Sequence, residues 1–238
     1  MITGMMARRI AAAADPFAAY LIANLTMQGS HGSTTFTDTT GRSWSAVNNA
    51  TITTADSDVS TGAATFDGVN DGIQTSDSDD FHFGTSVFTI EAFFKLPDVS
   101  GNHCIISQWS SVQRSFILYI SGSSVGFAAS SGGSSNIVSF VTASGVIAAN
   151  TLTHIALERN NSHATSPAGF QLYVNGTQVT ASGGLSAATS LYNSSASIRV
   201  GLDADNNNDM LGLIAGVRVY KGIFKYGGNF TPPEYPFT

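Results

Sequence analysis

The sequence is poor in charge and almost without cysteine. Only 11% of its 238 residues are Asp, Glu, Lys or Arg, against roughly a quarter in an ordinary globular protein. Ser, Thr, Asn and Gly must therefore supply most of the polar surface. The single cysteine, Cys104, excludes an internal disulfide, and its apolar neighbours predict that the side chain is a small buried hydrophobic group.

Two further absences argue against a nucleic-acid partner and against a membrane-spanning helix. The 10 basic residues are outnumbered by 16 acidic ones, which argues against nucleic acid, because phosphate recognition needs clustered Lys and Arg. No apolar run reaches the ~20 residues of a membrane-spanning helix. The N-terminus superficially resembles a secretion signal, but Asp15 and Pro16 interrupt it, so we expect a protein made in the cytoplasm without export.

What the sequence does contain is a series of short extended segments. Apolar and polar residues alternate from Val87 to Leu96, which predicts a strand lying on a core. Phe93 breaks the alternation, and we expect a loop or a second layer to cover it. Brief apolar runs between Gly- and Ser-rich turns, without helical period or repeat, are typical of a sandwich or barrel. The further predicted strands are Ala18–Met27, Cys104–Trp109, Ser115–Ser121, Val125–Ala128, Ile137–Thr142, His154–Arg159, Phe170–Val174, Gln178–Thr180, Ile198–Gly201 and Leu213–Tyr220.

Local signals mark a turn and both ends of the chain. Asn175 and Gly176 accept the positive φ angles of a tight hairpin. The prolines of segment 230–238 lack N–H donors, so this segment is expected to wrap in extended form over the sandwich. Residues 1–14 form an N-terminal arm in which Met5–Ala14 has the composition of a short docking helix. The alternative is a disordered terminus.

The order of several motifs resembles concanavalin A-like, laminin-G-type jelly-roll domains. The motifs are FDGVND from Phe66, FHFG from Phe81, FTIEAFFK from Phe88, HIALER from His154, LYVNG from Leu172 and the closing strand 212–222. The resemblance implies an all-β fold, a two-sheet antiparallel jelly-roll sandwich that occupies residues 15–238. The flanks at Gly32–Asp38 and Phe224–Pro233 are similar to the version found in bacteriophage virion and tail-associated proteins.

The resemblance of these flanks implies a non-enzymatic structural protein of a bacteriophage virion. A short chain without heptads or repeats suits a capsid decoration or appendage subunit better than a long fibre. We therefore expect capsid or tail proteins as partners and many copies, as homo-oligomers. The alternative is a lectin domain of a tail or host-adhesion protein that binds host-surface glycans.

The sequence shows no recognisable set of catalytic residues. Glycoside hydrolysis needs two carboxylates, about 5–5.5 Å apart for retention and about 6.5–9.5 Å for inversion. The chain has only three glutamates, Glu91, Glu158 and Glu234, and no predicted strand carries an acidic pair on one face. A pair assembled from two different strands stays open. His154 is expected to be structural, and no histidine has the spacing of a zinc ligand.

One acidic loop is a candidate calcium site. Its oxygen-bearing side chains stand at alternate positions, as a hard cation accepts them: Asp203, Asp205, Asn207 and Asp209. The loop is not an EF-hand, because Asn208 and Ile214 replace the required Gly and Glu. Laminin-G-type relatives hold calcium at the rim of the sandwich. The alternative is a hydrophilic turn whose side chains cap their own backbone.

A glycan site would combine polar loop residues with exposed aromatic rings. The candidates are Asp67, Asn70 and Asp71 in the turn before Gly72, with Trp109 and Tyr192 as aromatic platforms. The same Asp-rich turn is also a second candidate for calcium. For each aromatic residue the alternative is a place in the core or at an interface.

Overall fold

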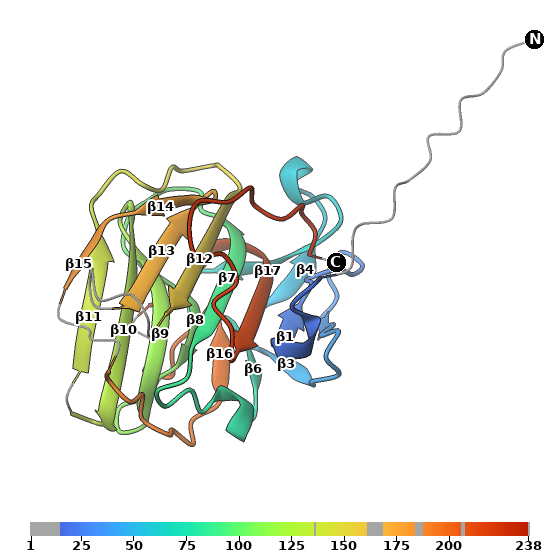
Figure 1. The fold of residues 1–238 in the computed structure, drawn as a ribbon. Coiled ribbons are helices and arrows are strands. Elements are labelled where there is room, and N and C mark those ends of the chain that lie inside the picture. Colours follow the sequence, from blue (N-terminus) through green and yellow to red (C-terminus); the bar gives the residue numbers. More distant parts are fainter. Residues whose placement is uncertain (1–14, 136, 161–168, 184–187, 206–207, 238) are drawn as a thin grey trace, which may run out of the picture.

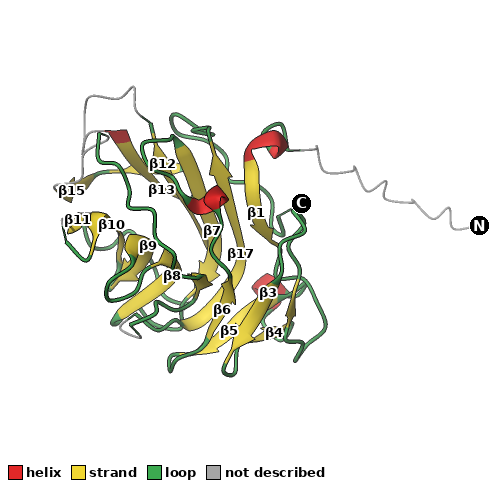
Figure 2. Ribbon diagram, turned by 90° about the horizontal axis from the view of Figure 1, so that it is seen from below, coloured by secondary structure: helices red, strands yellow, loops and turns green. Residues whose placement is uncertain are grey.

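Two antiparallel sheets packed face to face form the molecule, as the sequence predicts (Figures 1 and 2). The computed structural model describes residues 15–135, 137–160, 169–183, 188–205 and 208–237. The predicted arm, residues 1–14, lies outside the described residues. No helix in the described part of the chain is long and apolar enough to cross a membrane.

Sheet A contains eight strands among the described residues, in the order β14-β13-β12-β7-β17-β5-β4, and β1 also pairs with β17. The central strand β7 lies between β12 and β17 and pairs with both. The strands are β1 Leu21–Leu25, β4 Thr51–Thr53, β5 Ala63–Asp67, β7 Phe88–Lys95, β12 Thr153–Arg159, β13 Phe170–Val174, β14 Thr177–Val179 and β17 Leu211–Lys221.

Sheet B contains nine strands among the described residues, in the order β15-β11-β10-β9-β8-β16-β6-β3-β2. They are β2 Thr35–Phe36, β3 Trp44–Val47, β6 Gly72–Thr75, β8 Asn102–Gln108, β9 Arg114–Ser121, β10 Ser124–Gly133, β11 Ile137–Thr142, β15 Ala181–Gly183 and β16 Ile198–Val200. The described residues also contain three short 3₁₀ helices: η1 Ala18–Tyr20, which precedes β1, and η2 Ser57–Val59 and η3 Asp79–Phe81, which lie between strands.

The core lies between the sheets and confirms the alternation of β7. Phe88, Ile90 and Phe94 are fully buried in it. The ring of Phe88 contacts those of Phe83 and Phe170, at centroid distances of 4.4 and 6.2 Å. Full burial of one such side chain stabilises the fold by roughly 1.5–3 kcal/mol, so the inner face of this strand anchors the sandwich.

The predicted hairpin at Asn175 and Gly176 is confirmed. Both residues have positive φ, 49° and 77°, and they join β13 to β14. A Cβ atom on Gly176 would lie 1.9 Å from the carbonyl oxygen of Phe230. Gly176 is therefore required both by the turn and by the segment that crosses it.

One of the Gly- and Ser-rich segments predicted to form turns between strands, Ser130–Ser135, does so only in part. Strand β10 continues through it to Gly133. The register shifts between Ala129 and Gly133, so the additional residues form an irregularity in the ladder. Ser130 stabilises it, because its hydroxyl donates to the carbonyl of Ser135 at 2.7 Å.

The C-terminal segment 223–237, here called the strap, lies extended over the outer face of sheet A (Figure 1, red). This confirms the prediction made from its prolines. Phe93 points to this outer face, where Phe237 and Tyr235 pack on its ring at centroid distances of 4.9 and 5.8 Å. The strap is thus the second layer that the broken alternation at Phe93 indicates.

Candidate functional site

The outer face of sheet B carries a small apolar cluster. Along β9, Phe116 and Leu118 enter the core, whereas Ile117 joins Cys104 and Ala128 on the opposite side. Trp109 and Tyr119 pack against this cluster and are only half-buried. The face therefore presents two aromatic rings above a floor of small residues.

Tyr119 lies across the neighbouring strand because its partner is glycine. In the β9–β10 register, Tyr119 is opposite Gly126. A Cβ atom at Gly126 would be 2.3 Å from Cζ of the Tyr119 ring, so no side chain fits beneath it. Burial of one side of the ring raises the pKa of Tyr119 above its usual value.

Trp109 lies beside two charged side chains, near the end of β9 opposite to Tyr119. The guanidinium of Arg114 lies 5.5 Å from the centroid of the Trp109 ring, within cation–π range. Arg114 also pairs with Asp205 at 3.5 Å. Both charged side chains are partly exposed, 25% for Arg114 and 19% for Asp205, so this group offers donors and an acceptor to solvent.

The described residues on both sides of 206–207 contact β8 and the predicted site residues. At one end, the N–H of Ala204 donates to the carbonyl of Trp109 at 3.0 Å. At the other end, the N–H of Asn70 donates to Asp209 Oδ2 at 3.0 Å. The loop thus links Trp109 to the β5–β6 turn that contains Asp67, Asn70 and Asp71. Asn207 lies outside the described residues.

The carboxylates of this region mainly fix turns. Asp71 is 2% exposed, and its two oxygens accept the N–H groups of Asn49 and Asp67. Asp67 and Asp203 each accept the N–H of the residue two positions on, at 2.8 and 2.9 Å. Within the described ranges, no three His, Cys, Asp or Glu side chains are placed to hold a metal ion. Calcium binding stays a prediction.

Tyr192 contacts the strand β10 next to Arg114, which belongs to the charged group around Trp109. Its ring packs on Gly133, with Cε1 2.9 Å from the position of a Cβ atom there, and Gly133 is the strand partner of Arg114. The structure thus places the second predicted aromatic residue beside the same strand pair. Sequence reasoning missed Tyr119 and Arg114. The turn at Gly122 gave a usable signal, because a hairpin closed there aligns Tyr119 with Gly126.

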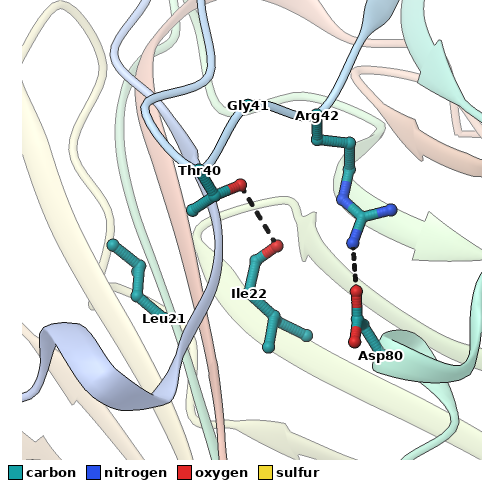
Figure 3. Close-up of a pocket in the computed structure, with 6 residues that line it drawn as sticks. All are labelled: Leu21, Ile22, Thr40, Gly41, Arg42 and Asp80. Carbon is teal, nitrogen blue, oxygen red and sulfur yellow. Dashed lines mark hydrogen bonds and ion pairs between the residues drawn. The ribbon is translucent and has the colours of Figure 1, made fainter.

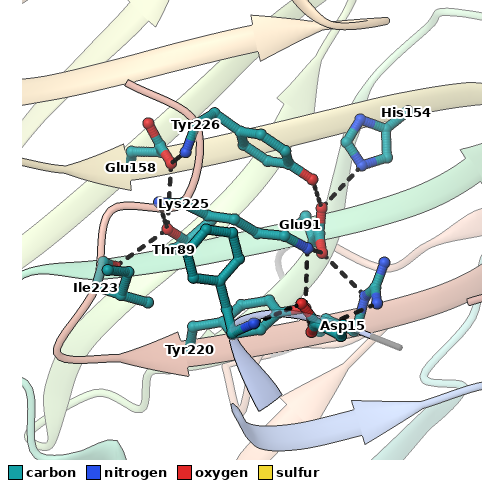
Figure 4. A network of polar contacts seen from close by, with 11 residues as sticks. Asp15, Thr89, Glu91, His154, Glu158, Tyr220, Ile223, Lys225 and Tyr226 are labelled. Carbon is teal, nitrogen blue, oxygen red and sulfur yellow. Dashed lines mark hydrogen bonds and ion pairs between the residues drawn. The ribbon is translucent and has the colours of Figure 1, made fainter. Parts of the chain in front are cut away.

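A second polar region lies on the outer face of sheet A, beneath the strap (Figure 4). Glu91 is fully buried there and forms ion pairs with Arg218 and Lys225, each at 2.9 Å. It also contacts Nε2 of His154 at 3.2 Å and the hydroxyl of Tyr226. Burial alone would raise the pKa of Glu91, but His154 and the two cations hold it well below its usual range.

Glu158 lies on the same face, on the strand beside Glu91. The register places Glu158 opposite Thr89, two residues before Glu91 on β7. Its carboxylate accepts the N–H groups of Tyr226 and Gly227, at 2.6 and 2.9 Å. Two carboxylates from different strands therefore share one face, the arrangement that the sequence left open. Both are turned to the strap and hold it in place.

A shallow hollow of about 400 Å³ lies near the start of β1 (Figure 3). Its wall includes the ion pair between Arg42 and Asp80, whose atoms are 2.5 Å apart. Thr40 and the backbone of Ile22 close the opposite side through a 3.5 Å hydrogen bond. None of the described residues that line this hollow has an aromatic side chain, so these residues do not form a stacking surface like that of sheet B.

The two antiparallel sheets packed face to face define a sandwich of the jelly-roll class. A sequence profile of the concanavalin A-like lectin/glucanases superfamily matches residues 66–225, more than half of the chain. The chain belongs to this superfamily. No curated protein matches the sequence.

Solved structures share the fold at low identity. The binding domain of Paraclostridial Mosquitocidal Protein 1 has a TM-score of 0.60 and 15% identity, over 90% of this chain and 50% of that one. The receptor binding domain of botulinum neurotoxin type G has 0.54 and 15%, over 89% and 48%. Domain 4 of AbnA, a GH43 extracellular arabinanase from Geobacillus stearothermophilus, solved in complex with arabinotriose, has 0.53 and 15%, over 85% and 92%. The chain spans about half the length of the first two.

Proposed function

We propose that the protein binds carbohydrate on the outer face of sheet B. The observation that carries this proposal is the pair of half-buried rings, Trp109 and Tyr119, above the small residues Gly126 and Ala128. A sugar ring has an apolar face of C–H groups that packs on an aromatic ring, while its hydroxyls need donors and acceptors at the edge. Exposed apolar surface rimmed by polar groups marks an interaction site.

The charged pair beside Trp109 supplies the polar edge. The guanidinium of Arg114 offers N–H donors, and the carboxylate of Asp205 accepts hydroxyl protons. Trp109 and Tyr119 stand near opposite ends of β9, so their rings are separated by on the order of 15 Å at the usual rise of a strand. This separation suits an oligosaccharide that contacts both rings better than a single sugar.

The fold comparison supports the proposal in one respect. The match covers 92% of the AbnA domain, and this domain was solved in complex with arabinotriose. The superfamily name also includes lectins. Because identity to the solved structures is only 15%, the ligand class proposed here rests on the residues of sheet B.

The test is the Trp109→Ala variant on a glycan array, followed by titration with the best glycan. We expect affinity to fall about tenfold or more, since loss of 1.4 kcal/mol of stacking is a factor of ten. Phe224→Ala is the matched control, because Phe224 is an exposed ring on the strap. Absence of any bound glycan, or equal affinities for Trp109→Ala and the control, would contradict the proposal.

We further propose, on the sequence resemblance alone, that the protein is a non-enzymatic component of a bacteriophage virion. Mass spectrometry of purified virions tests the proposed location, and absence of the protein from the virions would refute it. Incubation with capsular and cell-wall polysaccharides tests whether the protein is an enzyme, since new reducing ends would reveal hydrolysis. Repeating the glycan titration with calcium and with a chelator tests the proposed cation, for which equal affinities would count against a role.

A further inference from the structure

A second hollow, of about 540 Å³, lies at the edge of sheet A. Pairing between β13 and β14 ends at Leu172 and Val179. After Thr180 the chain crosses to sheet B, where β15 pairs with β11. The crossing leaves the hollow beside β13, with a volume inside the range of about 300–1,000 Å³ that small-molecule sites occupy.

Two carboxamides that line this hollow have their oxygens already engaged. Asn229 Oδ1 accepts the backbone N–H of Gln178 at 2.8 Å. Gln171 Oε1 accepts the hydroxyl of Tyr173 at 2.6 Å. A carboxamide has one oxygen acceptor and two N–H donors. With each oxygen fixed by a protein donor, the NH₂ groups of Asn229 and Gln171 are left as oriented donors for a ligand.

The rest of the lining restricts the ligand further. Val179 and Ala181, which are only partly buried, contribute apolar surface, whereas Phe170 and Leu172 are 2% and 1% exposed. None of the described residues that line the hollow carries a charge. A charged ligand would find no counter-charge in this lining. The hollow therefore suits an uncharged molecule with oxygen acceptors and one apolar face.

We propose that this hollow is a second carbohydrate subsite, which takes a neutral sugar unit through Asn229 and Gln171. The proposal rests on the proposed function, because it assumes that saccharide is the ligand class. The two sites belong to different sheets and share no residue, so each can be measured separately. Binding at both would let one molecule contact two sugar units at once.

The test uses NMR of the ¹⁵N-labelled full chain titrated with methyl β-glucoside and methyl N-acetyl-β-glucosaminide. We expect the backbone amides of Gln171, Gln178 and Asn229 to shift with either sugar. In Asn229→Asp the oxygen that accepts from Gln178 is retained but the N–H donors are lost. Affinity at the hollow should then fall about tenfold, as one lost hydrogen bond of 1–1.5 kcal/mol implies.

Asn102→Asp is the control, since it makes the same change at an exposed position on sheet B and should leave the shifts unchanged. No shift at the hollow, or equal affinity in Asn229→Asp, would overturn the proposal. In Trp109→Ala the shifts at Asn229 should persist while those around Tyr119 disappear. In the unmodified protein, shifts at the hollow without any shift around Tyr119 would mean that the proposed function fails at its own site on sheet B and not at this one.

Discussion

The outer faces of the two sheets follow the same alternation and differ in what covers them. On sheet A, Glu91 and Glu158 are fully buried, and the strap supplies several of their partners. On sheet B, Trp109 and Tyr119 lie half-exposed over small residues. Buried charge is tolerated only when it is paired, whereas an aromatic ring over glycine needs no partner. The covered face therefore stabilises the protein, and the open face is the one that we propose binds ligands.

The sharpest way to break this contrast is Glu91→Gln. The substitution leaves Arg218 and Lys225 without their buried counter-charge, and loss of one partner of a buried ion pair costs about 3–5 kcal/mol. The free energy of unfolding in urea measures it. Glu234→Gln, at an exposed position on the strap, should cost less than about 0.5 kcal/mol. Similar values for the two variants would contradict the role given to Glu91.

A second test loosens only the end of the strap. Phe237 is 2% exposed, packs on Phe93 and lies 3.9 Å beneath the guanidinium of Arg218. Phe237→Ala should therefore cost about 3 kcal/mol, measured by thermal unfolding. Hydrogen exchange at the amide of Phe230, which donates to Gly176, should also become faster. Unchanged exchange there, with Phe224→Ala as the control, would show that the strap does not depend on its last ring.

A third test disturbs the open face. In Gly126→Ala the new Cβ atom meets the Tyr119 ring at 2.3 Å, so the ring must leave its place on β10. Overpacking of this kind costs about 1–3 kcal/mol, and glycan affinity should fall about tenfold because one platform is displaced. Gly228→Ala is the control, since no atom lies within 4 Å of a Cβ there. Unchanged glycan affinity in Gly126→Ala would remove Tyr119 from the site.

The smallest effect is expected at a partly exposed ion pair of sheet A. Lys95 extends from β7 to Asp56 and Asp58, at 2.8 Å from each. The hydrogen bond from Lys95 lowers the pKa of Asp56 below its usual 3.8. A carboxyl group with a lowered pKa stabilises the fold at pH values above its ordinary pKa. This stabilisation is lost as the pH falls through the lowered pKa of the folded protein.

Asp56→Asn should therefore cost less than about 1 kcal/mol at pH 7, because the ion pair is partly exposed. The difference from the unmodified protein should vanish in acid, below the lowered pKa of Asp56. Urea unfolding at pH 7 and at successively lower pH checks both statements. A constant difference across the whole range would mean that the carboxylate acts through packing and not through its charge.

The sheets could be predicted from the sequence because their signals are local. Alternation in Phe88–Lys95 and the Asn175–Gly176 turn depend only on neighbouring residues, and both are confirmed. The burial of Glu91 could not be predicted in this way. Its partners Arg218 and Lys225 are more than a hundred residues away in the sequence, and only the fold brings them together.

The candidate site was predicted in part, for a similar reason. The loop Asp203–Asp209 and Trp109 were selected separately for their residue types, and a single backbone hydrogen bond from Ala204 shows that they adjoin. Tyr119 was overlooked because its sequence neighbours suggest an ordinary core strand. Its importance comes from the glycine on the next strand, which is a property of the pairing and not of the segment itself.

The covered face of sheet A also determines how the domain can be presented. Asp15 is bonded to the hydroxyl of Tyr220 at 2.7 Å, and Phe237 packs on the same sheet, so the first and last described residues leave from one side. A carrier or a neighbouring domain fused at either point would lie on the side of sheet A. The aromatic surface of sheet B would then point away from it, and copies fixed to one support would all present this surface.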